Sequence, residues 1–200
     1  MSRDILSIEF AGLPGAGKST VARTLAAAVG TWNPDGYQAA RQARLLQRVR
    51  VAPLLTAASL RSRRHRMWYS QLARQKAAVA ADLTPIVFDE GAAHLAWWLA
   101  MQGNPVGRIR VVTDVVIFLD VEENVARARL GSRASRVGTF GKQLLADRSG
   151  DVWRAGVSEY KPIRRHVGAL VIDNNGALET AIEAIIEGLG LSLGSSQHHP

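Results

Sequence analysis

The sequence predicts an α/β fold in which a parallel sheet lies between layers of helices. Two observations support this prediction. Short, continuous apolar runs alternate with longer helical segments, and the first run leads through a glycine-rich turn into a helix. Continuous apolar strands are typical of a parallel sheet that helices cover on both faces. We expect strands at residues 5–10, 85–88, 115–119 and 169–173.

Helical periodicity occupies most of the sequence between these strands. Pro34 and Gly36 predict a turn, and Pro53 separates two of the helices. No repeat or linker divides the chain, so residues 1–190 are expected to form one domain, followed by a flexible tail at 191–200. The expected helices are residues 18–29, 37–51, 54–81, 92–101, 122–130, 147–166 and 177–189.

The length and composition limit the classes of protein to which the chain can belong. Its 200 residues suffice for one domain with a substantial core. No apolar stretch approaches the ~20 residues of a membrane-spanning helix, and the amino end lacks the charged and apolar regions of a signal segment. The chain has no cysteine, which excludes disulfide and thiolate chemistry. We therefore expect a cytoplasmic protein without a membrane partner.

The excess of positive charge is confined to one segment. The net charge is +8, and residues 36–81 contain ten Lys or Arg and no Asp or Glu, whereas the rest of the chain has fifteen basic and seventeen acidic residues. Such a concentration of charge attracts anionic partners, nucleic acid among them, and the attraction weakens with salt. The alternative is a solvated helical face without a partner.

Residues 11–20, AGLPGAGKST, match the spacing of a phosphate-binding loop. Glycine lets the backbone wrap closely around an anion because it has no Cβ, and the helix that begins at Lys18 adds the positive end of its dipole. Lys18 would reach the β- and γ-phosphates, and Ser19 would ligate Mg²⁺. The sequence therefore predicts a P-loop NTPase fold that binds ATP and Mg²⁺ through Gly12, Gly15, Ala16, Gly17, Lys18, Ser19 and Thr20.

Asp89 follows the strand expected at residues 85–88. Ligands of open parallel sheets lie at the carboxyl ends of the strands. The Asp89 carboxylate is therefore a candidate both for holding Mg²⁺ and for accepting the proton of the phosphoryl acceptor. The alternative is a structural role as the N-cap of the helix expected at residues 92–101.

Arginines cluster where the helix at residues 122–130 runs into a basic, glycine-spaced loop. A mobile lid that carries them, expected at residues 131–145, would close over the phosphates, expel water and stabilise the transferring charge. Arg129 and Arg133 are one helical turn apart and would act together. For each arginine the alternative is a solvated surface charge. The expected catalytic residues are Lys18, Asp89, Arg129 and Arg133.

Four stretches, taken in order, resemble the P-loop nucleoside and nucleotide kinases, nearest the thymidylate kinase and deoxynucleoside kinase branch: FAGLPGAGKST, IVFDEG, VIFLDVEENVARARLGSR and ALVIDNNGALETAIEAI. The resemblance implies a sheet of five parallel strands, ATP as the donor, a lid arginine that assists transfer and, commonly, a homodimer. It also implies that the loop after the last strand contacts adenine, here through Asn175. The family usually has an arginine after the acidic residue that ends the third strand, whereas here Glu90 follows Asp89.

The predicted reaction is transfer of the γ-phosphoryl group of ATP to a nucleoside or nucleoside monophosphate, with the basic helices at residues 37–81 over the acceptor. One alternative is a kinase for a hydroxyl of a polynucleotide, at an end or on a modified base. Another is a kinase for a different small hydroxylated acceptor, and the last is a P-loop ATPase that is not a kinase. Aromatic side chains near the site would stack on a base or pack in the core. The candidate substrate contacts are Asp35, Arg63, Arg66, Trp68 and Arg136.

Overall fold

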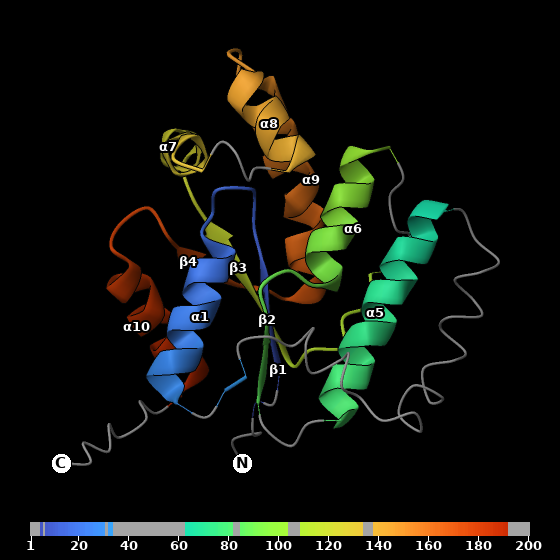
Figure 1. Cartoon of the computed structure of the whole chain (residues 1–200), viewed down its shortest axis with the longest axis vertical. Coiled ribbons are helices and arrows are strands. Elements are labelled where there is room, and N and C mark those ends of the chain that lie inside the picture. The colour runs from blue at the N-terminus through green and yellow to red at the C-terminus, as the bar shows by residue number, and fades with distance from the viewer. Residues whose placement is uncertain are drawn as a thin grey trace.

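The sheet of the protein has four parallel strands in the order β2-β1-β3-β4. It is seen in a computed structural model that describes residues 5, 7–30, 32–33, 63–81, 85–103, 109–133 and 138–191. Figure 1 shows the sheet between layers of helices, as the continuous apolar runs predicted. The strands are β1 (Ser7–Ala11), β2 (Ile86–Phe88), β3 (Val115–Asp120) and β4 (Leu170–Asp173).

In the described residues the sheet therefore has four strands, not the five that the family resemblance implied. Beside β2, where a fifth strand would lie, the described residues include a single bridged position. Asn33 forms a parallel bridge with Ile86, donates its N–H to the Pro85 carbonyl at 2.8 Å and accepts the N–H of Val87 at 2.9 Å. One bridged residue does not make the repeated ladder of a strand. The four strands expected from the apolar runs are the ones that form.

Helices cover both faces of the sheet (Figure 1). α1 (Lys18–Val29) and α10 (Leu178–Leu189) pack together on one face. α5 (Arg63–Ala81), α6 (Ala92–Met101) and α9 (Asp151–Val167) lie on the other, with α6 between its two neighbours. No helix in the described ranges is long and apolar enough to cross a membrane.

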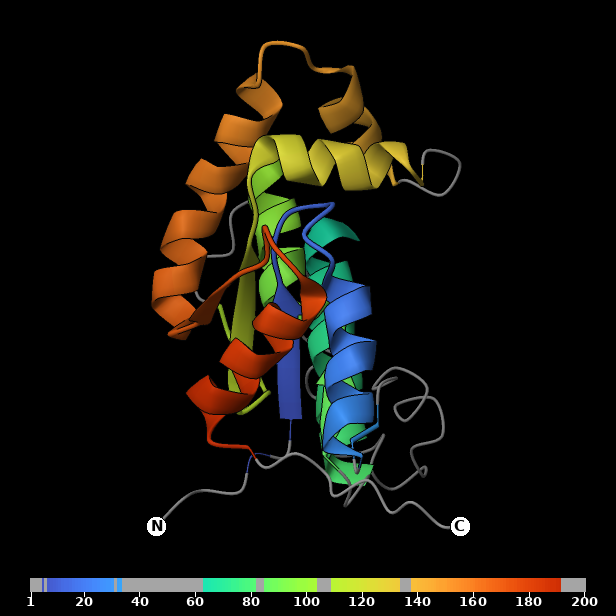
Figure 2. The same cartoon turned by 90° about the vertical axis from the view of Figure 1, so that its left-hand side faces the viewer.

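Two further helices stand beyond the carboxyl ends of the strands, as both views show (Figures 1 and 2). They are α7 (Glu123–Gly131) and α8 (Thr139–Ala146). Much of the segment expected to be a loop is thus helical, and residues 134–137 lie outside the described part of the chain. α9 begins at Asp151, not at residue 147 as expected, and it continues through Pro162 to Val167.

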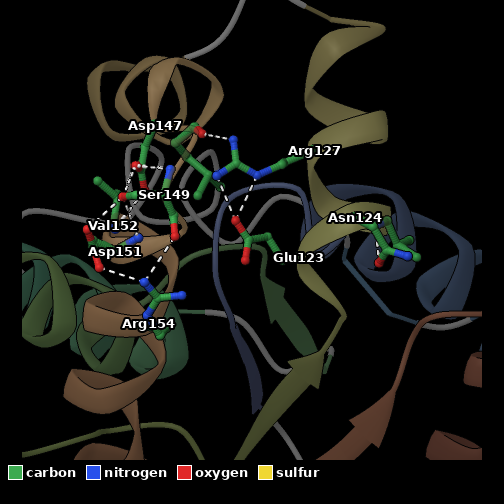
Figure 3. A network of polar contacts seen from close by, with 10 residues as sticks. Glu123, Asn124, Arg127, Asp147, Ser149, Asp151, Val152 and Arg154 are labelled. Atoms are coloured by element: carbon green, nitrogen blue, oxygen red, sulfur yellow. Dashed lines mark hydrogen bonds and ion pairs between the residues drawn. The ribbon is translucent and has the colours of Figure 1, made fainter.

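A polar network fixes α7, α8 and α9 to one another (Figure 3). Glu123 accepts two hydrogen bonds from Arg127, at 2.8 and 2.6 Å, and Arg127 also donates to the carbonyl of Leu144 in α8. Asp147 accepts the N–H of Val152 at 2.8 Å, which satisfies a donor in the first turn of α9. Arg127 therefore holds α8 in place.

Aromatic packing joins α6 to α9 beneath the loop that follows β1. Trp97 stacks on Tyr160 with ring centroids 4.8 Å apart and planes inclined by 11°. The indole N–H of Trp97 donates to the Gly156 carbonyl at 2.9 Å. Both aromatic side chains are buried, and a pair of this kind adds about 0.5–1.5 kcal/mol to the stabilisation from burial alone. The two helices thus form a firm support for the site above them.

Candidate active site

The chain turns sharply between β1 and α1. Gly12, Gly15 and Gly17 have φ angles of +148°, +87° and +86°, which residues with a side chain rarely adopt. A Cβ on Gly12 would lie 2.8 Å from the carbonyl oxygen of Leu119, and one on Gly15 would lie 2.6 Å from that of Ala126. The glycines therefore allow this loop to close against β3 and α7.

The amide groups of the loop are arranged to receive an anion. In the described part of the chain, the N–H groups of Gly15, Gly17, Lys18 and Ser19 have no hydrogen-bond acceptor. They lie at or before the N-terminus of α1, where the positive end of the helix dipole adds to their attraction for negative charge. Phosphate oxygens are the acceptors that such a turn binds.

Lys18 is buried, and its ammonium group lies inside the loop. It donates to the carbonyl oxygens of Gly12 at 2.9 Å and Leu13 at 3.3 Å, and it pairs with Glu90 at 3.4 Å. Burial lowers the pKa of Lys18, and the Glu90 carboxylate opposes that shift. Glu90 thus supplies the negative charge that a phosphate oxygen would otherwise bring to Lys18.

Ser19 and Asp89 are in direct contact at the carboxyl ends of β1 and β2. The hydroxyl of Ser19 donates to Asp89 Oδ2 at 2.9 Å. The N-cap of α6 is Gly91, so the alternative of Asp89 as the helix cap is wrong. A hydroxyl and a carboxylate are ligands that suit Mg²⁺, which completes its shell with water and phosphate oxygens. The described residues contain no group of three or more His, Asp or Glu side chains placed to hold a metal by themselves.

Two arginines face the loop, Arg129 from α7 and Arg133 from the turn that follows it. Within the described residues, Nη1 of Arg129 is buried and has no hydrogen-bond partner. It would lie 3.8 Å from a Cβ on Gly17. Arg133 Nη2 is 3.5 Å from the hydroxyl of Thr20. A buried guanidinium nitrogen without a partner indicates a place for an anion, here next to the amide groups of the loop.

Asn174 supports the loop from the side of β4. Its side-chain amide donates to the Ala16 carbonyl at 2.6 Å, and its backbone N–H donates to Asp120 at 2.8 Å. The neighbouring Asn175, the candidate for contact with adenine, accepts the N–H of Glu122 at 2.7 Å. The sequence indicated only a turn here, so it did not distinguish the two asparagines.

A second support comes from α9 and α6. The N–H of Gly12 donates to the hydroxyl of Tyr160 at 3.2 Å. The same hydroxyl lies 2.6 Å from Nδ1 of His94, whose Nε2 lies 3.4 Å from Glu90. Burial, reinforced by the charge of Lys18, lowers the pKa of His94 to about 4. His94 is therefore neutral at pH 7 and links the loop to Glu90 without adding charge.

A buried acid in β1 positions the start of α6. Glu9 accepts the N–H of Ala93 at 2.6 Å and the side-chain amide of Gln75 at 2.9 Å. Burial raises the pKa of Glu9, and these hydrogen bonds oppose the shift. A Cβ on Gly91 would lie 2.1 Å from Glu9 Cδ. The acid and the glycine together fix the course of the chain that carries Asp89 and Glu90.

A cavity of about 520 Å³ opens above the loop, between α6, α7 and α8. The unpaired loop amides and the Arg129 nitrogen fit phosphate groups, and the oxygen atoms of Ser19 and Asp89 fit Mg²⁺. The fold thus brings most of the predicted catalytic residues into one place. Among the residues that line the cavity are Lys18, Ser19, Glu90, Arg129 and Arg133.

Two of the predicted substrate contacts, Trp68 and Arg66, have described side chains, and both lie on α5. Trp68 is 2% exposed and donates its indole N–H to a carbonyl of α6 at 3.2 Å, which favours core packing over stacking on a base. Arg66 is exposed on α5. Asp35, Arg136 and the side chain of Arg63 lie outside the described residues.

Comparison with known proteins finds likeness at the level of the fold. No family model and no curated protein matches the sequence. A structure of deoxyadenosine kinase from M. mycoides with the products dCMP and a flexible dCDP matches at 18% identity, over 92% of this chain and 98% of that chain, with a TM-score of 0.57. The same kinase matches with dCTP bound, at the same identity and coverage and a TM-score of 0.55. It also matches with dATP bound, over 92% and 99% of the two chains at 18% identity, with a TM-score of 0.53.

The matched structures are of a deoxyadenosine kinase, which is the kind of protein that the four sequence stretches resemble. The likeness covers almost the whole length of the chain and of the kinase it matches, so it includes the helices over the cavity as well as the sheet. The chain therefore has the fold of these deoxyadenosine kinase structures.

Proposed function

We propose that the protein is an ATP-dependent kinase that transfers the γ-phosphoryl group to a nucleoside or nucleoside monophosphate. The observation that carries this proposal is the grouping of Lys18, Arg129 and Arg133 around a loop in which four amides have no acceptor among the described residues. Phosphoryl transfer needs little covalent chemistry from the protein, but it needs positive charge around the transferring group. The M. mycoides kinase, which has the same fold, holds deoxynucleotides.

The position of each side chain supports a separate role. Lys18 would exchange Glu90 for the β- and γ-phosphates, and Ser19 and Asp89 would hold Mg²⁺, which neutralises phosphate charge when bound. Arg129, from α7, and Arg133, from the turn after it, would approach the phosphates and exclude water as part of a lid. The side chains that hydrogen-bond to the loop backbone would keep the loop in this conformation.

A polynucleotide acceptor is the second candidate, because of the charge on α5. This helix has no acidic residue, and its Arg66 and Arg74 are exposed and line a second cavity beside α6. Cations without acidic neighbours attract the phosphates of nucleic acid. The rest of the basic segment, up to residue 62, lies outside the described part of the chain.

The test is phosphoryl transfer from labelled ATP in the presence of Mg²⁺. One tube contains pooled nucleosides and nucleoside monophosphates, and another contains single- and double-stranded DNA. We expect label in an acceptor and none with the Lys18→Ala variant, because the variant lacks the cation at the transferring phosphate. Label in DNA alone would replace the first acceptor class by the second. Consumption of ATP with no labelled acceptor in either tube would contradict a kinase.

A further inference from the structure

A second cavity, of about 500 Å³, lies between α5 and the start of α6. Glu90 and His94 line it on the α6 side, and the same two residues also line the cavity above the phosphate loop. The two cavities therefore meet at Glu90, beside Lys18. The α5 wall of the second cavity is formed by Arg66, Ser70, Gln71 and Arg74.

The α5 wall carries two positive charges and no negative charge. Arg66 and Arg74 are exposed, and no acidic side chain of the described residues pairs with either. Eight residues of helix separate their backbones by roughly 12 Å. Two long arginine side chains at this spacing can approach one phosphate of an extended molecule from either side.

The inner end of the cavity has the opposite charge. The carboxylate of Glu90 lies 3.4 Å from Lys18 Nζ and 3.4 Å from His94 Nε2. The contact with the ammonium group of Lys18 is an ion pair, in which Glu90 carries the negative charge. A phosphate group placed at this end would be repelled, whereas a hydroxyl would donate a hydrogen bond to the carboxylate.

We propose that the second cavity binds an acceptor whose reacting hydroxyl lies at Glu90 and whose phosphate lies further out, at Arg66 and Arg74. A short nucleotide chain with an unphosphorylated terminal hydroxyl meets both conditions. The inference rests on the proposed kinase function. It selects the end of a polynucleotide among the candidate acceptors and assigns Glu90 a role that the sequence did not indicate.

The groups that meet at this position account for the proton and for both bonds that change in the transfer step. When donor phosphates bind Lys18, Glu90 loses its cationic partner and faces the acceptor. Glu90 takes the proton of the acceptor hydroxyl, the hydroxyl oxygen bonds to the γ-phosphorus, and the bond from that phosphorus to the bridging oxygen of ADP breaks. Asp89 is less suited to take this proton because it is engaged with Ser19 at 2.9 Å.

The experiment compares two acceptors that differ in the distant phosphate. Deoxyadenosine has none, and the deoxyadenosine dinucleotide with a 5′-hydroxyl has one internal phosphate. With labelled ATP and Mg²⁺, we expect the wild-type KM for the dinucleotide to be about tenfold lower than the KM for deoxyadenosine. This difference is the effect of one or two charge-assisted hydrogen bonds. In the double variant R66A/R74A, the KM for the dinucleotide should rise to the KM for deoxyadenosine. The variant K76A, changed at an exposed lysine of α5 outside the cavity, should behave as the wild type.

The possible results separate this inference from the kinase proposal. Equal KM values in the wild type, or an advantage that survives in R66A/R74A, would overturn the inference. Preferred phosphorylation of dAMP to dADP would overturn it as well. If no acceptor is phosphorylated, the kinase proposal fails, and titration of a fluorescent dinucleotide still tests the site. Binding that is lost in R66A/R74A supports it, whereas equal or undetectable binding contradicts it.

Discussion

Asp89 and Glu90 are consecutive acids at the end of β2, and the fold gives them different partners. Asp89 accepts the hydroxyl of Ser19, whereas Glu90 pairs with Lys18 and lies against His94. The two carboxylates can therefore serve different groups, one the metal and the other the acceptor. The ammonium group of Lys18 cannot pair fully with Glu90 and with a donor phosphate at the same time. Glu90 would therefore compete with the donor for this cation.

Replacing Glu90 by glutamine should separate donor binding from transfer. We expect E90Q to bind ATP more tightly, by up to about fivefold, because an ion pair with a half-exposed partner is worth about 1 kcal/mol or less. Transfer should slow in the same variant because an amide does not take a proton. Calorimetric titration with ATP and Mg²⁺ measures the first effect, and single-turnover kinetics measures the second.

The matched control is Glu159→Gln, which removes an exposed acid of α9. Its ATP affinity and transfer rate should equal those of the wild type. Weaker ATP binding by E90Q would show that Glu90 supports the donor site, contrary to the competition described here.

At the scale of secondary-structure elements, the site depends on how α6 meets β1. Glu9 lies under the first turn of α6 and accepts the N–H of Ala93, so a strand residue supplies the acceptor for an unpaired helix amide. Gly91 leaves the space that the Glu9 side chain occupies. The same contact sets the direction of the two acids that precede the helix.

Adding one methyl group at this contact should destabilise the fold. The Cβ in G91A would lie 2.1 Å from Glu9 Cδ and 2.4 Å from Gln75 Nε2, and both side chains are buried. We expect a loss of about 1–3 kcal/mol in the free energy of unfolding, the usual cost of overpacking. Urea denaturation followed by circular dichroism measures it.

Gly131→Ala provides the comparison for that variant. Gly131 is the last residue of α7, and a Cβ there meets nothing within 4 Å. Alanine should be neutral or stabilise the protein by up to about 1 kcal/mol, as expected for a better helix former. If the two variants are equally stable, the space at Gly91 is not constrained by Glu9.

At the scale of the whole molecule, the site is assembled by contacts between distant parts of the chain. Ser19 meets Asp89, Gly12 meets Tyr160 and Ala16 meets Asn174, across 70, 148 and 158 positions of sequence. The parallel sheet makes this possible because the carboxyl ends of all its strands lie at one edge. Folding of the whole chain is thus a condition for the geometry of the loop.

Acid should weaken the whole fold partly through His94. Its pKa is lowered from 6.5 to about 4 in the folded protein, so the unfolded chain takes up this proton at higher pH. The stabilisation is present above pH 6.5 and is lost as the pH falls towards 4. We expect the advantage of wild type over H94Q in unfolding free energy to shrink by about 3 kcal/mol over this range.

Urea denaturation of both proteins at several pH values provides the measurement. The buried Glu9 has a raised pKa and therefore an opposite pH dependence, but it is present in both proteins and cancels in the difference. A difference that stays constant between pH 7 and pH 4 would show that His94 titrates normally in the folded state.

The phosphate loop, the four strands and most of the helices were predictable from the residues themselves. Glycine at close-approach positions, apolar runs and helical periodicity act over a few neighbouring residues, so a linear pattern is enough to reveal them. Lys18, Ser19, Arg129 and Arg133 could be selected as candidates for the same reason, since each lies in or near such a pattern. The fifth strand came from the resemblance and not from an apolar run, and it is represented by Asn33 alone in the described residues.

The contacts that support the loop followed only from the folded chain. The same is true of the different partners that the two acids at the end of β2 have. Nothing near Asn174, Tyr160 or His94 in the sequence points to the loop, because their contacts join segments that are far apart along the chain. Glu90 likewise gains its significance from Lys18 and from the two cavities that meet beside it. Local preferences select the elements, whereas the packing of the elements decides which side chains share one site.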